Sequence, residues 1–431
     1  MNTETKLKRI ALLSSQDKER KFECVMHHVN FETLRGNFLR LDAKKAKGID
    51  GVSKEEYGKD LEDNLNRLID ELKRMAYKPR PVKEHLIPKD GQPGKFRPLG
   101  ISVFEDKLVQ GAFRQILEAI YEPLFLDCSH GFRPKRGCHT AIKDLRKYLY
   151  ENDIETVIDI DLKNFFGTID HKILESFLRE KITDERFIRY IIRMFKAGVL
   201  SEGDLVIGDE GVPQGSICSP ILSNVFAHKV LDEWIEQTIQ PYCKGKVKLF
   251  RYADDAIICV EKEHDAIRIR EALPKRLEKY KLVLNEEKTK MVNFSRVKVQ
   301  KGIPQDTFNF LGFTFYWGKT RKGRIVPKLK TSSKTMDTKL EKVKIWIKDI
   351  RNKTRMKEIW GTFCAKLRGH IQYYGISFNS KQVQKFHWEA TRLVFKWLNR
   401  RSQKKSFTWK KFIKFMERFP LPKVRICHSF F

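Results

Sequence analysis

The sequence contains no long hydrophobic segment. Its 431 residues include no apolar run of about 18 or more, which excludes an ordinary transmembrane helix. The N-terminus, MNTETKLKRIALLSSQDKERK, also lacks the apolar core of a secretory signal, and its early acidic residues argue against a transit peptide. We therefore expect an intracellular protein that does not span a membrane.

Cysteine pairs and metal-binding cysteine motifs are missing as well. The 8 cysteines are scattered singly, without a CxxC pair or a matched Cys/His spacing. Cys128, Cys138 and His139 come nearest, but their spacing is wrong for a zinc finger. These cysteines are typical of the reduced thiols of cytosolic proteins. Internal repeats and low-complexity tracts are likewise absent from the sequence.

Acidic residues are too few to balance the basic ones. The chain has 86 lysines and arginines against 55 acidic residues, a net charge of +31. Residues 321–431 alone carry 30 basic and 6 acidic residues, or +24, and residues 1–320 carry only +7. A cationic segment of this kind binds polyanions by releasing condensed counterions, so nucleic acid is the expected partner. An anionic membrane and a basic face kept for solubility are the weaker alternatives.

The residues that are present predict a globular protein of mixed secondary structure, since hydrophobic residues make up 41%. Helical periodicity marks residues 1–80, 104–122, 138–151, 171–198 and 264–281. Strand or ribbon signals mark residues 78–98, 155–162, 247–260 and 308–316. From about residue 325 onward the pattern is helical, with an apolar stripe over 386–401. The predicted class is α+β, followed by an α-helical and strongly basic appendage.

Adjacent aspartates divide the apolar segment FRYADDAII at 250–258. If this segment is a hairpin, its turn exposes Asp254 and Asp255 beyond the strand ladder. Nucleotidyl transfer by two metal ions requires several converging carboxylates, and Mg²⁺ prefers oxygen ligands. An ordinary aspartate-containing turn is the plainer interpretation of the same residues.

A third carboxylate is available at the end of the predicted strand ETVIDIDL. Asp159 and Asp161 point to the same face of that strand, so the alternation of side chains does not choose between them. A buried structural aspartate is the plainer interpretation of either residue. The combination with the adjacent aspartates and the basic tail favours a nucleic-acid polymerase.

Ordered blocks of sequence make the resemblance to one family specific. They are IPKDGQPGKFRPLGI (87–101), SHGFRPKRGCHTAI (129–142), VIDIDLKNFFGTIDH (157–171), GVPQGSICSPILSNVFAHKVLD (211–232), FRYADDAIICV (250–260), LNEEKTK (284–290) and FNFLGFTF (308–315). The sequence resembles the group II intron-encoded reverse transcriptases, or maturases, and LRGHIQYYG (367–375) resembles their thumb or maturase domain. This resemblance implies the fingers and palm of a right-hand polymerase, an antiparallel sheet with helices, followed by an α-helical thumb/maturase domain.

The implied subdomains follow the chain in order. Residues 1–80 would form an N-terminal extension and the start of the fingers, and 81–155 the fingers. Residues 156–318 would form the palm, with part of the fingers between 172 and 205, and 325–431 the helical thumb/maturase domain.

The resemblance also assigns the catalytic carboxylates. Asp161, Asp254 and Asp255 would be the catalytic residues and the ligands of two Mg²⁺ ions, for which Mn²⁺ can substitute. Asp161 is preferred to Asp159 because these enzymes place an aromatic residue five positions after the metal-binding aspartate, here Phe166. A ring beneath the sugar leaves no room for a 2′-hydroxyl and so selects deoxynucleotides. Phe165, its neighbour, is expected in the core.

Four further residues are implied to bind the incoming dNTP. Lys89 and Arg97 would clamp its triphosphate, Gln214 would contact its sugar and position the template, and Lys288 would protonate the departing pyrophosphate. Basic residues on an ordinary surface are the plainer interpretation of the three cations. The aromatic block 308–315 would be the primer grip, although core packing explains it nearly as well. Exposed members of a set of tail aromatics would stack on RNA bases: Tyr373, Tyr374, Trp388, Trp397 and Trp409.

The implied function is RNA-directed DNA polymerisation, which copies intron RNA into cDNA, together with assistance to intron splicing. The partners would be structured intron RNA, an RNA template with a DNA or RNA primer, and dNTPs, in the bacterial cytoplasm. No Cys-rich or His-rich endonuclease segment precedes the end at Phe431, so we expect no cleavage of a DNA target. The alternatives are a reverse transcriptase of another lineage (retron- or defence-associated), a splicing-only maturase, and an RNA-directed RNA polymerase, against which Phe166 argues.

Overall fold

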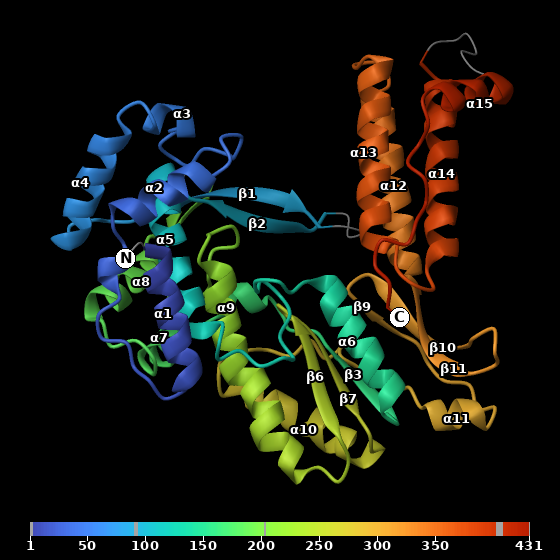
Figure 1. Ribbon diagram of the computed structural model, residues 1–431, viewed down its shortest axis with the longest axis horizontal. Coiled ribbons are helices and arrows are strands. Elements are labelled where there is room, and N and C mark those ends of the chain that lie inside the picture. The colour runs from blue at the N-terminus through green and yellow to red at the C-terminus, as the bar shows by residue number, and fades with distance from the viewer. Residues whose placement is uncertain (1–2, 90–93, 202–203, 402–407, 431) are drawn as a thin grey trace. The chain divides into compact units, whose positions relative to one another are not determined.

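The computed structural model describes residues 3–89, 94–201, 204–401 and 408–430 (Figure 1). The chain forms two compact units. The first unit comprises Met1–Ala141 and Thr156–Met291, and the second comprises Ile142–Glu155 and Val292–Phe431. The two units are defined by the compactness of the fold and not by function, so the boundaries of the fingers, palm and thumb stay a prediction.

Helices at the N-terminus enclose one end of the first unit. They are α1 (Thr3–Gln16), α2 (Phe31–Arg40), α3 (Lys54–Tyr57), α4 (Leu61–Lys73) and the long α5 (Phe104–Tyr121). The side chain of Asn30 caps α2, and Ser53 with Glu56 forms a capping box on α3. Helices α1 and α2 both pack against α5, whose apolar side chains are buried. The mostly helical pattern predicted for 1–80 and 104–122 is confirmed.

A small mixed sheet follows in the order β2-β1-β4-β5. Strands β1 (Val82–Pro88) and β2 (Phe96–Ile101) form the predicted antiparallel ribbon, with Ile87 opposite Arg97. Strand β4 (Val199–Ser201) joins β1 in parallel and pairs with β5 (Asp204–Val206).

A second sheet, the central sheet, has the order β6-β7-β3-β8. Its strands are β3 (Thr156–Ile160), β6 (Val247–Tyr252), β7 (Asp255–Val260) and β8 (Lys290–Asn293). Figure 1 shows β3, β6 and β7 side by side, and helix α10 (Glu263–Glu278) packs against β3 and β7. Five of the six residues of β7 are buried, as expected for an apolar inner strand covered by a helix.

The predicted helical stretch 171–198 contains two helices rather than one. Helix α7 (His171–Arg179) ends before Asp184, which caps α8 (Glu185–Lys196) by accepting from the backbone N–H groups of Arg186 and Phe187. The second Asp184 oxygen accepts from Val25 and Met26 at 2.8 Å each, so this cap also fixes the N-terminal segment. The other helical elements up to residue 242 are α6 (Cys138–Glu151), α9 (Ser219–Ala227) and the short segments η1 (Met26–His28), η2 (Phe165–Gly167), η3 (His228–Asp232), η4 (Trp234–Ile239) and η5 (Gln240–Tyr242).

The second unit contains a three-stranded antiparallel sheet and a helical bundle. The sheet has the order β11-β10-β9, with β9 (Phe308–Phe310), β10 (Phe313–Lys319) and β11 (Ile325–Thr331). The helical pattern expected from residue 325 is therefore wrong for 325–331, because this segment pairs along its whole length with β10. Helices then follow, and Figure 1 shows α12, α13 and α14 side by side. Besides most of α6, the helices of this unit are α11 (Arg296–Gln300), α12 (Ser333–Ile350), α13 (Met356–Tyr374), α14 (Ser380–Leu398) and α15 (Trp409–Arg418).

Within the described residues, no helix combines the length and the hydrophobicity that crossing a bilayer requires.

Candidate active site

The turn between β6 and β7 carries the adjacent aspartates. The hairpin closes at the pair Tyr252–Asp255, so Asp254 and Asp255 stand at the end of the ladder. Ala253, which precedes them, has a φ of 56°, in the left-handed region that residues with a Cβ rarely adopt. The predicted hairpin with an aspartate pair at its tip is confirmed, and its turn is strained.

Asp161 reaches the same end of the central sheet from β3. Ile160 pairs with Ala256, so the next residues outward on the two strands are Asp161 and Asp255. The backbone N–H of Asn285 donates to the carbonyl of Asp161 at 2.8 Å, and the Asn285 side-chain amide donates to its carboxylate at 2.7 Å. The Lys288 ammonium lies 3.4 Å from the same carboxylate oxygen. The segment 284–290 thus fixes the position of Asp161 through hydrogen bonds and an ion pair.

Electrostatic coupling shows how the acidic groups gather. Burial and the charges of Asp254, Asp159 and Asp161 raise the pKa of Asp255 to about 7. Asp255 remains exposed to solvent, and the three neighbouring carboxylates disfavour its ionised form by like-charge repulsion. Burial also raises the pKa of Asp254, where Asp161 adds to the effect and Arg97 opposes it.

Asp159 is a fourth carboxylate of this group. It lies inside the ladder opposite Ile257, whereas Asp161 lies beyond the last pair. Burial and the charge of Asp161 raise the pKa of Asp159 to about 6. Position therefore favours Asp161 as the outward-facing ligand, and the choice between the two stays a prediction.

The carboxylates fit a hard divalent cation by their chemistry. Oxygen ligands are those that Mg²⁺ prefers, and a group of mutually repelling carboxylates is relieved by a bound cation. In the part of the chain that the structure describes, no three His, Cys, Asp or Glu side chains are already close enough to form a complete metal site. The donor set is present, and further ligands would have to come from substrate phosphates and water.

Comparison with known proteins agrees with this geometry. Residues 87–315, just over half of the chain, match the family described as reverse transcriptase (RNA-dependent DNA polymerase). The group II intron-encoded protein LtrA of Lactococcus lactis subsp. cremoris is 41% identical over 176 residues, which are 41% of this chain and 29% of LtrA. The chain belongs to the group II intron-type reverse transcriptase family. The family predicted from the ordered sequence blocks is confirmed.

Two further relatives show the range of this family. Protein YkfC of Escherichia coli (strain K12) is 33% identical over 312 residues, which are 64% of this chain and 78% of YkfC. A protein described as an uncharacterized 91 kDa protein in the cob intron of Schizosaccharomyces pombe is 42% identical over 174 residues, 40% of this chain and 21% of that protein. The match thus covers less than a third of LtrA and of the fission yeast protein, but most of YkfC.

The aromatic pair after Asp161 divides between core and surface, as expected for this reverse transcriptase. Phe165 is 2% exposed and packs edge-on against Phe226. Phe166 is half-buried, its ring contacts Phe132 and Phe165, and its carbonyl accepts from the Val212 N–H at 2.8 Å. Phe165 is therefore a core residue, and the sugar-selecting role of Phe166 stays a prediction.

Gln214 lies in a loop that presses against the ribbon. Its carbonyl accepts from the Gly100 N–H at 2.6 Å. The next residue, Gly215, has a φ of 109°, and a Cβ there would lie 2.5 Å from the Gly100 carbonyl oxygen. Glycine is required at this position because the backbones of the loop and of β2 meet. This contact fixes the backbone from which the half-buried Gln214 side chain projects.

The predicted triphosphate clamp is brought to the site only in part. Arg97 on β2 is exposed and close enough to lower the pKa values of Asp254 and Asp255 against the effect of burial. Lys89 is exposed at the end of the ribbon, where its backbone N–H donates to the Lys95 carbonyl at 2.8 Å. Lys288, the least specific prediction from sequence, lies directly at Asp161.

The aromatic block 308–315 packs inward. Its phenylalanines, Phe308, Phe310, Phe313 and Phe315, are at most 4% exposed and form the core of the β9–β10 pair. A primer grip through these rings therefore gains no support from the structure, and the alternative of core packing accounts for them.

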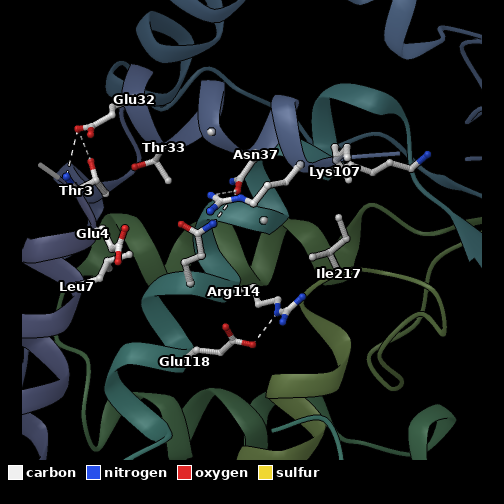
Figure 2. A pocket seen from close by; sticks show the side chains of 15 residues that line it. Thr3, Glu4, Leu7, Glu32, Thr33, Asn37, Lys107, Arg114, Glu118 and Ile217 are labelled. Carbon is white, nitrogen blue, oxygen red and sulfur yellow. Dashed lines mark hydrogen bonds and ion pairs between the residues drawn. The ribbon is translucent and has the colours of Figure 1, made fainter. Parts of the chain in front are cut away.

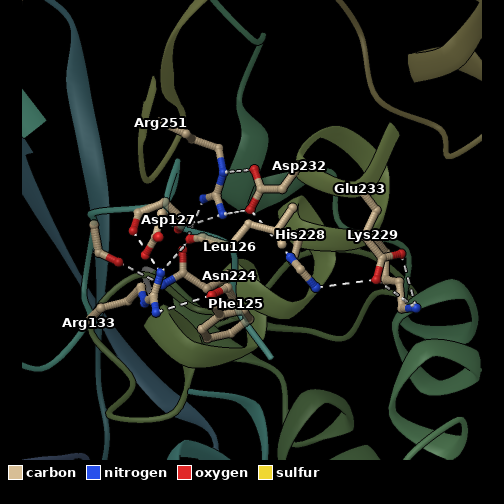
Figure 3. Close-up of polar contacts among 12 residues, drawn as sticks. Phe125, Leu126, Asp127, Arg133, Asn224, His228, Lys229, Asp232, Glu233 and Arg251 are labelled. Carbon is tan, nitrogen blue, oxygen red and sulfur yellow. Dashed lines mark hydrogen bonds and ion pairs between the residues drawn. The ribbon is translucent and has the colours of Figure 1, made fainter. Parts of the chain in front are cut away.

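A buried polar network beneath the aspartate turn is the feature that sequence reasoning missed (Figure 3). Arg251 and Asp232 are both 0% exposed and form a bidentate pair with two contacts of 2.6 Å. The remaining guanidinium N–H groups donate to Asn224 Oδ1 at 3.0 Å, Ser129 Oγ at 2.8 Å and the Ala253 carbonyl at 3.1 Å. All five donors of Arg251 are thus satisfied, and one of them holds the strained turn.

The same network fixes a second segment against that turn. The Asn224 amide donates to the Gly131 carbonyl at 2.7 Å, and a Cβ on Gly131 would collide with the backbone nitrogen of Ala253. The signal in the sequence was an arginine inside a largely apolar strand, with Asn224 and Asp232 in a helical segment rich in apolar residues. Charged residues in such positions are almost always paired when they are buried.

Proposed function

We propose that this reverse transcriptase is an RNA-directed DNA polymerase that copies intron RNA into DNA by two-metal nucleotidyl transfer. The observation that supports the proposal best is the convergence of Asp161 with Asp254 and Asp255, three carboxylates whose charges act on one another at the end of the central sheet. Asp161, Asp254 and Asp255 would hold two Mg²⁺ ions, which when bound would activate the primer 3′-hydroxyl and stabilise the departing pyrophosphate.

The protein's own side chains would prepare the substrate. Arg97, with Lys89 at the end of the same ribbon, would orient the triphosphate by fixed positive charge. Phe166 would exclude a ribose 2′-hydroxyl by its bulk, and Gln214 would contact the sugar from the loop anchored at Gly100. Lys288 would hold a proton beside Asp161 for the leaving pyrophosphate, a role that its position supports.

Single replacements test this assignment. Asp161→Asn, Asp254→Asn and Asp255→Asn should each lower primer extension on an RNA template by about 10³-fold or more, because each removes a charge from a site that works by electrostatic stabilisation. Dissociation constants for the same RNA should stay within a few-fold of the wild-type value. Asp63→Asn, an exposed residue of α4, is the matched control and should extend normally. Extension at the wild-type rate by any one of the three site variants would refute the role of that residue.

We infer a second function, assistance to intron splicing, from the charge distribution. Residues 321–431 carry +24 and include Trp388, which is 52% exposed and available for stacking. Splicing of the parent intron at low Mg²⁺ should require the protein and should persist in Asp255→Asn, because RNA binding does not need the catalytic carboxylates. Loss of splicing in that variant would contradict a separate RNA-binding role.

A further inference from the structure

A cavity of about 520 Å³ in the second unit is bordered by positive charge. Among the described residues that line it, none is acidic and six are basic: Lys143, Arg146, Lys147, Arg321, Lys322 and Arg324. Half of them belong to α6 and half to the turn between β10 and β11. Tyr150, Val326 and Phe430 supply apolar surface beside them. We call this cavity the cationic pocket.

Both walls of the cationic pocket are ordered by local structure. Lys143, Arg146, Lys147 and Tyr150 follow the spacing of one helical face, so α6 presents them together. In the opposite wall, the Thr320 N–H donates to the Arg324 carbonyl at 2.8 Å, and the Arg324 N–H donates to Thr320 Oγ1 at 3.1 Å. This turn is closed by backbone and threonine groups, so its basic side chains are not needed to hold it.

The basic side chains of the pocket differ in the contacts that they make. Arg146 is structural: it donates to the carbonyls of Phe430 at 3.1 Å and Pro327 at 3.3 Å. Lys147 lies 3.9 Å from Glu151, an exposed pair of the kind that contributes little. The other four cations form no ion pair with an acidic residue of the described chain. Their charge is left for a ligand.

A larger cavity of about 860 Å³ in the first unit shows the opposite arrangement (Figure 2). There the Arg114 guanidinium contacts the Glu118 carboxylate at 2.7 Å, and the hydroxyl of Thr3 donates to Glu32 at 2.9 Å. Its other cations are engaged by neutral protein groups, since Arg40 donates to Asn37 at 3.2 Å and Lys107 to the Ala46 carbonyl at 2.7 Å. The cationic pocket has no such internal compensation.

We propose that the cationic pocket binds the sugar–phosphate backbone of an unpaired RNA segment, with Tyr150 stacked against a base. Several cations around one cavity attract a polyanion and release its counterions. Tyr150, 42% exposed beside these cations, adds the aromatic surface typical of sites for single-stranded nucleic acid. An acidic peptide would use the cations but not the ring. The proposal rests on the proposed function only in taking RNA as the ligand, since the pocket lies in the second unit and the carboxylates in the first.

A triple variant of the β10–β11 turn tests the proposal. Arg321→Gln/Lys322→Gln/Arg324→Gln keeps the bonds of Thr320 and removes three charges. Each single-stranded phosphate contact contributes about 0.7 to the dependence of log Kd on log salt, so that slope should fall by about 2. If the two proteins bind RNA equally at 1 M KCl, a slope lower by about 2 makes the variant bind roughly 10²-fold more weakly than the wild type at 0.1 M KCl. Tyr150→Ser should weaken binding by roughly tenfold without changing the slope, because stacking does not depend on salt.

The matched control is Lys344→Gln/Lys353→Gln/Lys357→Gln, which removes the same charge from the same unit. None of these three lysines lines the cationic pocket, and two of them have acidic neighbours: Lys344 lies 3.0 Å from Glu341 and Lys353 is paired with Asp349. The control should bind RNA within about threefold of the wild type and lower the slope by less than 1. Equal loss of RNA affinity in the control and in the turn variant would overturn the proposal, because the pocket would then act only through net charge.

Two RNA ligands separate the possible sources of the segment. Affinity is measured for a structured RNA without a primer and for a short primed template, and loss on either one supports the pocket and shows which RNA occupies it. Unchanged affinity for both RNAs would overturn the proposal. Binding of polyglutamate, an anion without bases, is measured as well. If Tyr150→Ser weakens polyglutamate binding as much as RNA binding, the proposed stacking on a base is overturned. Extension of the short primed template at saturating concentration should stay normal in the turn variant. If wild-type protein fails to extend it, the proposed polymerase function fails while the binding comparison still stands.

Discussion

Arg251→Lys tests whether the buried network holds the aspartate turn as well as the fold. Lysine keeps the positive charge beside Asp232 but has three donors where arginine has five. At least two of the five acceptors that Arg251 satisfies would therefore lose their donor. The Ala253 carbonyl is the functional one among them, because it belongs to the left-handed residue directly before Asp254.

The size of the effect follows from burial. Each buried acceptor that loses its donor costs about 1–3 kcal/mol, so Arg251→Lys should lower the free energy of unfolding by about 2–6 kcal/mol. A shift of about 1 Å in the aspartate turn is enough to cost roughly 10²-fold in rate. We therefore expect kcat for primer extension to fall by about 10²-fold, with a much smaller change in the KM for dNTP.

Arg133→Lys is the matched control for this experiment. Arg133 is also buried, pairs with Glu122 at 2.9 Å, and donates to the carbonyls of Leu126 and Ser129 rather than to residues 253–255. It should lose stability in urea unfolding but keep kcat within a few-fold at a temperature where both variants are folded. If Arg251→Lys loses stability while kcat stays within twofold of the wild type, the network is structural only and the reasoning is refuted.

Three further predictions follow from individual residues. Phe166→Val should raise ribonucleotide incorporation by about 10-fold or more, and a nucleotide competition assay on an RNA template measures it. Asp106 accepts a hydrogen bond from Tyr77, and burial raises the pKa of its carboxyl group from 3.8 to about 6. Because the folded protein favours the protonated carboxyl group, the stabilisation from protonation is complete below pH 4 and is lost as the pH rises through 6. Asp106→Asn should abolish a decrease of roughly 3 kcal/mol in the free energy of unfolding between pH 4 and 7, which urea unfolding measures. Gly215→Ala should cost about 1–3 kcal/mol by strain against Gly100, which thermal unfolding would detect, and no loss would mean that the loop can move away.

Sequence reasoning succeeded where a residue type and its neighbours along the chain decide the structure. The aspartate hairpin was predictable because two apolar segments flank a short polar tip, and its register follows from the turn. The ribbon at Lys89 and Arg97 was predictable from proline and glycine spacing. Residues 325–331 misled the prediction, because a strand of seven residues and the first turns of a helix have similar apolar content until a pairing partner is known.

Long-range side-chain contacts were beyond that reasoning. Arg251 and Asp232 are 19 residues apart, and Ser129 lies 122 residues from Arg251, so no local pattern brings the three together. The contact of Lys288 with Asp161 spans 127 residues and emerges only when the segment after α10 lies beside β3. These contacts depend on tertiary packing rather than on periodicity, and that dependence is why they were missed or underrated.

The two kinds of charge in this protein act in opposite directions on RNA. The carboxylates at the end of the central sheet repel a phosphate backbone unless divalent cations are bound, whereas the net +24 of residues 321–431 attracts it. A unit charge at about 10 Å in water contributes about 0.4 kcal/mol, so Asp255→Asn in EDTA should bind a primed RNA template roughly twofold more tightly than the wild type. Filter binding at about 0.01 M KCl and about pH 9, where Asp255 is ionised and a charge at this distance is weakly screened, measures this change, and Asp63→Asn controls for net charge. Weaker binding by Asp255→Asn in EDTA would mean that Asp255 does not face the template strand.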